Sequence, residues 1–263
     1  MVRQAKWIGA TFGIAIIVAG APAWAKDNTP RSEYLSATEL PDMTNVIGPP
    51  PQAGSPTDTR DRQVYRETRA LAGTERFALA KSDAVISAQA LLDDFACAIG
   101  KKIDAEKAPV VARLLFTSAV EAGRATSTPK DKFKRQRPFV GSDDPICTPG
   151  DTRIEGSFAY PSGHAAFGWA QGLVLAEMMP EKSAEIMTRA RIYGESRVVC
   201  GVHTVSDIEA GRNIAATIVA RLHSVPAFQS DYAAAVKELA ATPGTTPSPA
   251  ICKIEAKAVT RPY

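Results

Sequence analysis

Three short segments of the chain combine cationic, hydroxyl and imidazole side chains at close spacing. They are Lys130 to Arg137-Pro138, then Pro161-Ser162-Gly163-His164, and then Ser196-Arg197 with His203 and Asp207. Histidine is rare in this sequence, with only three in 263 residues, and two of them lie in these segments. The three segments are therefore candidate parts of one functional site.

Five of these residues suit the binding of a tetrahedral oxyanion. The guanidinium groups of Arg137 and Arg197 match phosphate oxygens with two bonds each, while the Lys130 ammonium acts as a point charge. Ser162 adds a hydroxyl donor. Gly163 permits close backbone approach at the start of an expected helix, whose free N–H groups favour an anion. The pattern predicts an anion pocket.

The remaining three residues supply reactive groups. His203 and Asp207 are four positions apart, so they meet on one helix face or across a turn. A carboxylate bonded to one ring nitrogen fixes the tautomer and makes the other nitrogen a nucleophile or base. His164 is then available as a general acid that protonates a leaving oxygen.

Each of these features taken alone has a simpler explanation. A lone histidine is commonly solvated or capping, the run from Lys130 to Arg137 is typical of a solvated basic face, and Pro-Ser-Gly-His is a turn with an N-cap. Arg197 and Asp207 could form a surface ion pair. Their joint occurrence in this order favours the site. No third ligand accompanies the paired carboxylates Asp93-Asp94 and Asp143-Asp144, so no metal site is predicted.

Helical periodicity dominates the rest of the chain, and strand signals are weak. We predict an all-α fold, a single-domain bundle of six or more helices over residues 61–240. Residues 26–60 are rich in Pro and Gly and predict an extended arm that lies on the domain or is partly disordered. Residues 241–263 are predicted to be a mobile tail that Cys252 could tether.

Residues 1–25 have the pattern of a secretory signal peptide. Arg3 and Lys6 precede an apolar run, and Ala23-Trp24-Ala25 resembles a cleavage site. An uncleaved anchor is the alternative, although the apolar run is shorter than a membrane span needs. No other stretch is long and apolar enough to span a membrane. We therefore expect a periplasmic or secreted protein.

Charge and cysteine content constrain the partners and the compartment. Loss of Arg3 and Lys6 with the leader takes the formal charge from +3 to +1, which argues against a nucleic acid polymer as partner. The four cysteines, an even number, favour one or two disulfides in an exported protein, with three full pairings open. No CxxC pair is present, which argues against a zinc or redox site. The cysteines are Cys97, Cys147, Cys200 and Cys252.

The three segments together resemble the PAP2 and vanadium-haloperoxidase superfamily, whose pattern is K-x6-R-P, P-S-G-H and S-R-x5-H-x3-D. Every fixed position of that pattern is present here. Within it, the chain is similar to bacterial class A non-specific acid phosphatases over about residues 45–240. One difference is the run from Gly156 to Ala165, which is two residues longer before Pro161 than that class leads us to expect, with Ala165 in place of Thr.

The resemblance implies metal-independent hydrolysis of small phosphate monoesters over a broad range, without a cofactor and with vanadate as an inhibitor. His203 would be the nucleophile, Asp207 its orienting group and His164 the general acid and base. The phosphoryl oxygens would be held by Lys130, Arg137, Ser162, Gly163 and Arg197. The resemblance also favours a homo-oligomer.

Three other functions fit parts of the sequence. A vanadate-dependent haloperoxidase would use the same pocket with His203 as the vanadium ligand, but known members are much longer. A lipid phosphate phosphatase of the bilayer type would carry several spans. A phosphate-binding protein with a decayed site would not need the complete set of acid, nucleophile and orienting group.

Overall fold

The computed structural model describes residues 33–260, and within them the chain is helical. An isolated bridge between Lys102 and Thr245 is the only pairing of extended backbone in this part. The prediction of an all-α fold is confirmed. The helices are α1 (Thr44–Ile47), α2 (Pro56–Arg69), α3 (Glu75–Ser82), α4 (Ala88–Asp94), α5 (Ala96–Ile99), α6 (Pro109–Arg124), α7 (Ser127–Phe133), α8 (Thr152–Glu155), α9 (Gly163–Met178), α10 (Ser183–Val199), α11 (Val205–Leu222), α12 (Pro226–Ala241) and α13 (Pro249–Thr260), with a 3₁₀ turn at Pro180–Lys182.

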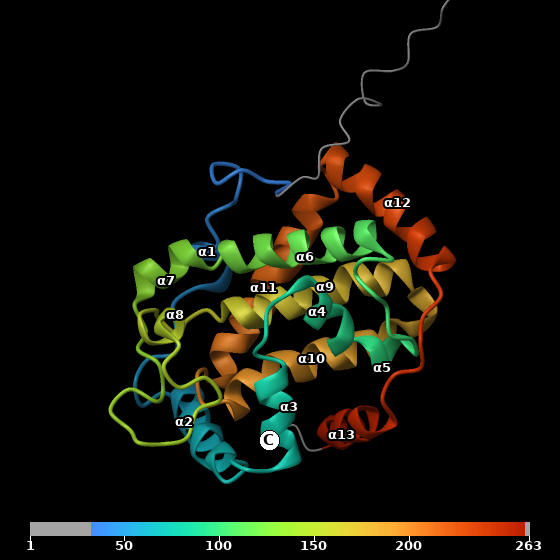
Figure 1. Cartoon of the computed structure of the whole chain (residues 1–263). Coiled ribbons are helices and arrows are strands. Elements are labelled where there is room, and N and C mark those ends of the chain that lie inside the picture. The colour runs from blue at the N-terminus through green and yellow to red at the C-terminus, as the bar shows by residue number, and fades with distance from the viewer. Residues whose placement is uncertain (1–32, 261–263) are drawn as a thin grey trace, which may run out of the picture. The chain divides into compact units, whose positions relative to one another are not determined.

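Helix α9 is the central helix of this bundle. It packs against α6, α10 and α11, and Figure 1 shows it running between α6 and α10. Its sequence is apolar almost all round, which is typical of a helix buried on every side. Ala166, Ala170 and Val174 are fully buried in the main core. The segment that begins with Pro161-Ser162-Gly163-His164 is thus anchored in the best-packed part of the molecule.

Hydroxyl caps and prolines determine where several helices begin. The side chains of Ser55, Thr74 and Ser87 accept backbone N–H bonds at the starts of α2, α3 and α4. Pro109 and Pro226 occupy the first turns of α6 and α12, where a missing N–H costs nothing. These local signals explain why the helix pattern was readable from the sequence.

The described part of the predicted N-terminal arm lies on the bundle. Leu35 and Met43 are fully buried in the main core, and α1 and the start of α2 fall before residue 61. The folded unit therefore begins earlier than the predicted boundary. The predicted leader, residues 1–25, and residues 26–32 of the arm lie outside the described residues.

The C-terminal segment, predicted as a mobile tail, is instead structured through residue 260. The Lys101 ammonium donates to the carbonyls of Leu239 and Thr242, and Lys102 bridges to Thr245. Beyond them, α13 is tied to α5 by the disulfide Cys97–Cys252. The run of Pro, Gly and Thr before α13 suggested mobility, whereas long-range contacts that a single sequence does not reveal hold it in place.

Candidate active site

His203 and Asp207 meet across the start of α11. His203 precedes the helix, and Asp207 is the third residue within it. His203 Nδ1 lies 3.3 Å from Asp207 Oδ2, and the backbone N–H of Thr204 donates to the same oxygen at 2.8 Å. The pair therefore meets across a turn rather than along a helix face. Because the carboxylate accepts, Nδ1 carries the hydrogen and Nε2 keeps its lone pair.

The free nitrogen of His203 faces Arg137. The distance from Arg137 Nη1 to His203 Nε2 is 3.1 Å, and bonds to Ser157 and Val202 fix the guanidinium. Burial lowers the pKa of His203 well below its usual value, and the charge of Arg137 lowers it further. The ring is consequently neutral. Its Nε2 lone pair points towards the guanidinium of Arg137, the cation that would hold a bound anion.

The start of α9 is fastened to the start of α11. Ser162 N–H donates to the Asp207 carbonyl at 2.8 Å, and the Ser162 hydroxyl caps the helix by accepting from Ala165 N–H at 3.2 Å. A Cβ added at Gly211 would lie 2.4 Å from the Ser162 carbonyl oxygen, so only glycine permits this approach. At Gly163 a Cβ would lie 3.0 Å from Thr126 Oγ1, so that glycine serves helix packing as well.

His164 is held by α3 and α10. Its Nε2 lies 2.6 Å from the Asp83 carbonyl oxygen, and its ring stacks on Tyr193 at 4.7 Å between centroids. Since a carbonyl only accepts, Nε2 carries a hydrogen and Nδ1 is the basic nitrogen of the neutral ring. Burial lowers the pKa of His164 well below its usual value, with a smaller contribution from Arg197 and a further one from His203.

The three predicted cations influence one another. Burial lowers the pKa of Lys130 to about 7, with Arg137 as the second cause. Burial also lowers the pKa of Arg137 to about 10, with Arg197 as the second cause, and that of Arg197 to about 10. Arg197 Nε is buried without a hydrogen-bond partner. Buried like charges and an orphaned donor indicate a place for an anion.

Lys130 comes from α7, a short helix of seven residues. Its ammonium donates to the Phe158 carbonyl at 2.6 Å and contacts the Ala159 carbonyl at 3.4 Å. Both carbonyls belong to the run that is longer than the resemblance led us to expect. The additional residues therefore contact the predicted anion pocket directly.

Sequence reasoning missed two residues that hold Asp207. Arg135 donates to Asp207 Oδ1 at 2.8 Å and to Asp61 Oδ2 at 3.0 Å, and Asp61 accepts from Ser206 N–H at 3.0 Å. Burial raises the pKa of Asp207, but the bonds from His203 and the charge of Arg135 outweigh it and hold that pKa at about 2. Arg135 could have been found from the sequence because it lies within the basic run from Lys130 to Arg137. No local pattern marks Asp61.

Replacing Arg135 with glutamine is expected to lower both stability and activity. The change would leave the buried carboxylates of Asp61 and Asp207 without their shared counter-ion, and breaking such a pair costs about 3–5 kcal/mol. Urea unfolding would measure the loss. Arg135→Lys should recover part of it, because one ammonium cannot bridge two carboxylates as a guanidinium does. A glutamine variant with unchanged unfolding midpoint and kcat would contradict this role.

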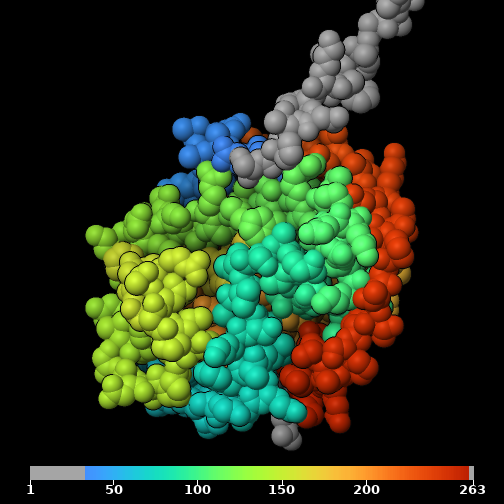
Figure 2. Space-filling view, viewed as in Figure 1, coloured from blue at the N-terminus to red at the C-terminus, as the bar shows by residue number. Residues whose placement is uncertain are grey.

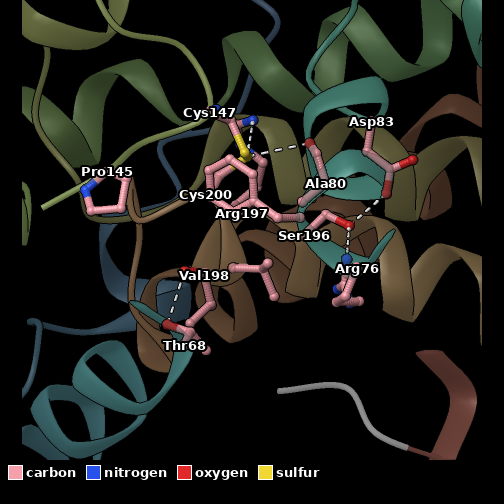
Figure 3. The surroundings of a disulfide bond; sticks show 12 residues. Thr68, Arg76, Ala80, Asp83, Pro145, Cys147, Ser196, Arg197, Val198 and Cys200 are labelled. Atoms are coloured by element: carbon pink, nitrogen blue, oxygen red, sulfur yellow. Dashed lines mark hydrogen bonds between the residues drawn. A yellow bond between two sulfur atoms is a disulfide. The ribbon is translucent and has the colours of Figure 1, made fainter. Parts of the chain in front are cut away.

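A disulfide closes the site on the side of Arg197. Cys147 pairs with Cys200, and Cys147 N–H donates to the Cys200 carbonyl at 3.1 Å. Figure 3 shows this bond beside Arg197 and Ser196. Together with Cys97–Cys252 it selects one of the three possible pairings, and neither cysteine of the site is a free thiol.

Two features are absent from the described residues 33–260. No group of three or more His, Cys, Asp or Glu side chains is arranged to hold a metal ion in this part of the chain. Within the same residues, no helix is both long and apolar enough to span a membrane. Of the predicted site residues, Ser162, Gly163, His164, His203 and Asp207 lie at the starts of α9 and α11, Arg197 lies near the end of α10, and Lys130 and Arg137 lie in α7 and the loop after it.

Comparison with known proteins gives a consistent result. Residues 110–230 match the model of the PAP2 superfamily. An acid phosphatase of Zymomonas mobilis is 39% identical over 92% of this chain and 94% of its own length. A non-specific acid phosphatase of Providencia stuartii is 36% identical over 88% and 94%, and one of Salmonella typhimurium is 36% identical over 78% and 83%. The similarity includes all three predicted segments.

Proposed function

Because this chain belongs to the PAP2 superfamily, we propose that it is an exported, metal-independent acid phosphatase that forms a phosphohistidine on His203. The observation that carries the proposal is the orientation of His203. Asp207 holds the hydrogen on Nδ1, so the lone pair on Nε2 faces the guanidinium of Arg137. That geometry provides a nucleophile beside a fixed charge for the phosphoryl oxygens.

The first step transfers the phosphoryl group to His203. Nε2 attacks phosphorus as the bond to the ester oxygen breaks, and the departing oxygen takes a proton from His164. Because Nε2–H of His164 is bonded to the Asp83 carbonyl, the transferred proton comes from Nδ1. A bound phosphoryl dianion favours the protonated ring and so opposes the effect of burial. Arg137, Arg197 and Lys130 balance the charge on the equatorial oxygens.

The second step returns the enzyme to its starting state. The neutral Nδ1 of His164 accepts a proton from water while the water oxygen attacks phosphorus and the P–N bond breaks. Phosphate leaves, and the lone pair returns to His203 Nε2. Asp207, whose pKa is held at about 2 and which is therefore ionised, stabilises the positive charge that the ring of His203 carries in the intermediate.

The range of substrates is proposed to be broad. The assigned ligands all address the phosphoryl group, and the acid–base group acts on the bridging oxygen that every monoester has. Selection among alcohols therefore depends on weak contacts outside this set. Small phosphate monoesters are the proposed substrates, and a nucleic acid polymer is not.

The function is tested by assaying the purified protein with EDTA present. We expect hydrolysis of p-nitrophenyl phosphate, a nucleotide and a sugar phosphate between pH 4 and pH 8. Vanadate, which mimics the five-coordinate phosphoryl transition state, should inhibit. No turnover of any of the three would overturn the proposal. Halide oxidation with vanadate and peroxide would then favour a haloperoxidase, and phosphate binding without turnover would favour a binding protein.

Export is supported by the leader pattern and by the two disulfides, which are typical of oxidising compartments. Sequencing the N-terminus of the exported protein should place its first residue at Lys26. A protein that retains Met1 and sediments with membranes would instead indicate an uncleaved anchor. Size-exclusion chromatography of the same material would test the proposed homo-oligomer.

Phosphate affinity should depend on pH through Lys130. Since burial and Arg137 lower the pKa of Lys130 to about 7, its positive charge is present below that pH and lost above it. We therefore expect KM to rise as the pH increases from 6 to 8. Lys130→Arg keeps the charge, so its KM should rise less over the same interval. Parallel KM curves for the two proteins would contradict this assignment.

A further inference from the structure

The tautomer of His164 depends on the position of a single carbonyl group. Its acceptor is the backbone oxygen of Asp83, 2.6 Å from Nε2. Asp83 is the residue that ends α3, where the backbone leaves the helical hydrogen-bond pattern. The Asp83 backbone is held by its own N–H bond to the Leu79 carbonyl and by the Ala84 N–H bond to the Lys81 carbonyl, and its buried side chain is a further attachment.

Two residues of α10 hold the Asp83 carboxylate. Arg189 donates from Nη2 at 2.6 Å and from Nη1 at 3.4 Å, and the Ser196 hydroxyl donates at 2.5 Å. Figure 3 shows Ser196 directed at Asp83 from α10. The Asp83 side chain is fully buried, so these partners are essential to keep its charge in place.

The Arg189 guanidinium is held in turn by α13. Glu255 Oε1 forms an ion pair with Arg189 Nε at 3.2 Å, without hydrogen-bond geometry, and Asp94 Oδ1 lies 3.6 Å from Nη2. Arg189 is only 3% exposed. Burial lowers the pKa of Arg189, but Asp83, Glu255 and Asp94 outweigh it and raise that pKa. The guanidinium thus stays charged and fixed between α3, α4 and α13.

Helix α13 is fixed at two further points. The disulfide Cys97–Cys252 joins it to α5, and the ammonium of Lys257 donates to Glu75 Oε2 on α3 at 2.6 Å. Figure 2 shows α13 in red packed against the neighbouring teal segment, in agreement with the contacts between α13 and α3. Lys257 and Glu75 are both exposed, unlike Glu255.

We propose that Glu255 is a positioning residue for the acid–base step, acting through Arg189 and Asp83 to hold the carbonyl that fixes His164. Glu255 then supports the acid–base step from α13, although that helix contributes no group to the anion pocket. This inference rests on the proposed function of His164. It adds a residue of α13, which lies outside the three segments that the sequence patterns identified.

The sign of the expected pH effect follows from the groups around His164. They are the Asp83 carbonyl from α3, Tyr193 and Arg197 from α10, and His203 before α11. The bond to the carbonyl favours the protonated ring, whereas burial and Arg197 oppose it. A weaker bond lowers the pKa of His164. The first step needs protonated His164, so kcat falls at high pH as His164 loses its proton. In a variant with a weaker bond, this fall in kcat should begin at lower pH.

The test compares Glu255→Gln with Lys257→Ala, which removes a different attachment of the same helix. For Glu255→Gln we expect kcat on glycerol phosphate to fall about three- to tenfold, the range typical of residues that act through a packed network. The fall with p-nitrophenyl phosphate should be smaller, because its leaving oxygen needs the proton less. KM and inhibition by inorganic phosphate should stay within about twofold, and Lys257→Ala should match the wild type.

His164→Ala serves as the reference, with an expected loss of about 10²-fold or more on the alkyl ester. If that variant discriminates between the two esters and Glu255→Gln does not, the role of Glu255 is refuted while the proposed function stands. If neither the wild type nor its variants turn over substrate, the proposed function itself fails. Should Glu255→Gln not fold, Glu255→Asp is measured in the same way. The role is refuted if the ratio of kcat on the two esters and the pH dependence of kcat are the same in that protein as in the wild type.

Discussion

Replacing His203 with alanine is expected to lower kcat by about 10⁴-fold or more, because the nucleophile is lost and no other group can take its place. Steady-state hydrolysis of p-nitrophenyl phosphate measures the effect. The loss should be similar for aryl and alkyl esters, since both need the same P–N bond. In this respect His203→Ala should differ from His164→Ala, which affects alkyl esters more.

His223→Ala is the matched control for this variant. His223 pairs with Glu177 at the surface, with Nε2 and Oε2 2.9 Å apart, and it has no contact with the site. Its removal should leave kcat and KM unchanged. A His203→Ala protein that is folded, binds phosphate and retains more than about one hundredth of the wild-type kcat would show that His203 is not the nucleophile.

The second large effect is expected from Asp207→Asn. The carboxamide can turn its N–H₂ group towards His203, which would place the hydrogen on Nε2 and remove the nucleophilic lone pair. It also removes the charge that stabilises the ring in the intermediate. We expect kcat to fall by about 10³- to 10⁴-fold, as when a buried aspartate that orients a catalytic histidine is neutralised.

Asp61→Asn separates this catalytic effect from the structural one. Both carboxylates pair with Arg135, at 3.0 Å for Asp61 and 2.8 Å for Asp207, but only Asp207 contacts His203. Both variants should therefore unfold at lower urea concentration, whereas only Asp207→Asn should lose most of its kcat. Equal losses of kcat would mean that Asp207 acts by holding the fold together rather than by orienting His203.

The helices were predicted, and the site residues proposed, from local patterns in the sequence. Helix α9 has apolar residues around its whole circumference, and Ser162 begins it with a hydroxyl cap, so both the helix and its start were readable locally. The proposed catalytic residues lie in three short segments that match the spacing of the family pattern. The match to the family pattern supports a function because residue type and spacing together restrict the chemistry that a site can perform.

The residues that sequence reasoning missed act over long separations. Asp61 and Asp83 come from α2 and the end of α3, and their partners Arg135, Ser196 and Arg189 lie more than seventy residues away in each case. Buried ion pairs of this kind have no local pattern. The order of residues 241–260 was not predicted for the same reason. Glu255 and the disulfide Cys97–Cys252 connect α13 to helices far earlier in the chain.

The most direct test of the central claim is to trap the intermediate on the enzyme. The purified protein is mixed with p-nitrophenyl phosphate, quenched rapidly in base, where a P–N bond survives, and digested for mass spectrometry. We predict a phosphoryl group on the peptide that contains His203, assigned to that residue by fragmentation and absent from His203→Ala. Phosphate on another side chain, or no phosphopeptide at any quench time during active turnover, would contradict a phosphohistidine on His203.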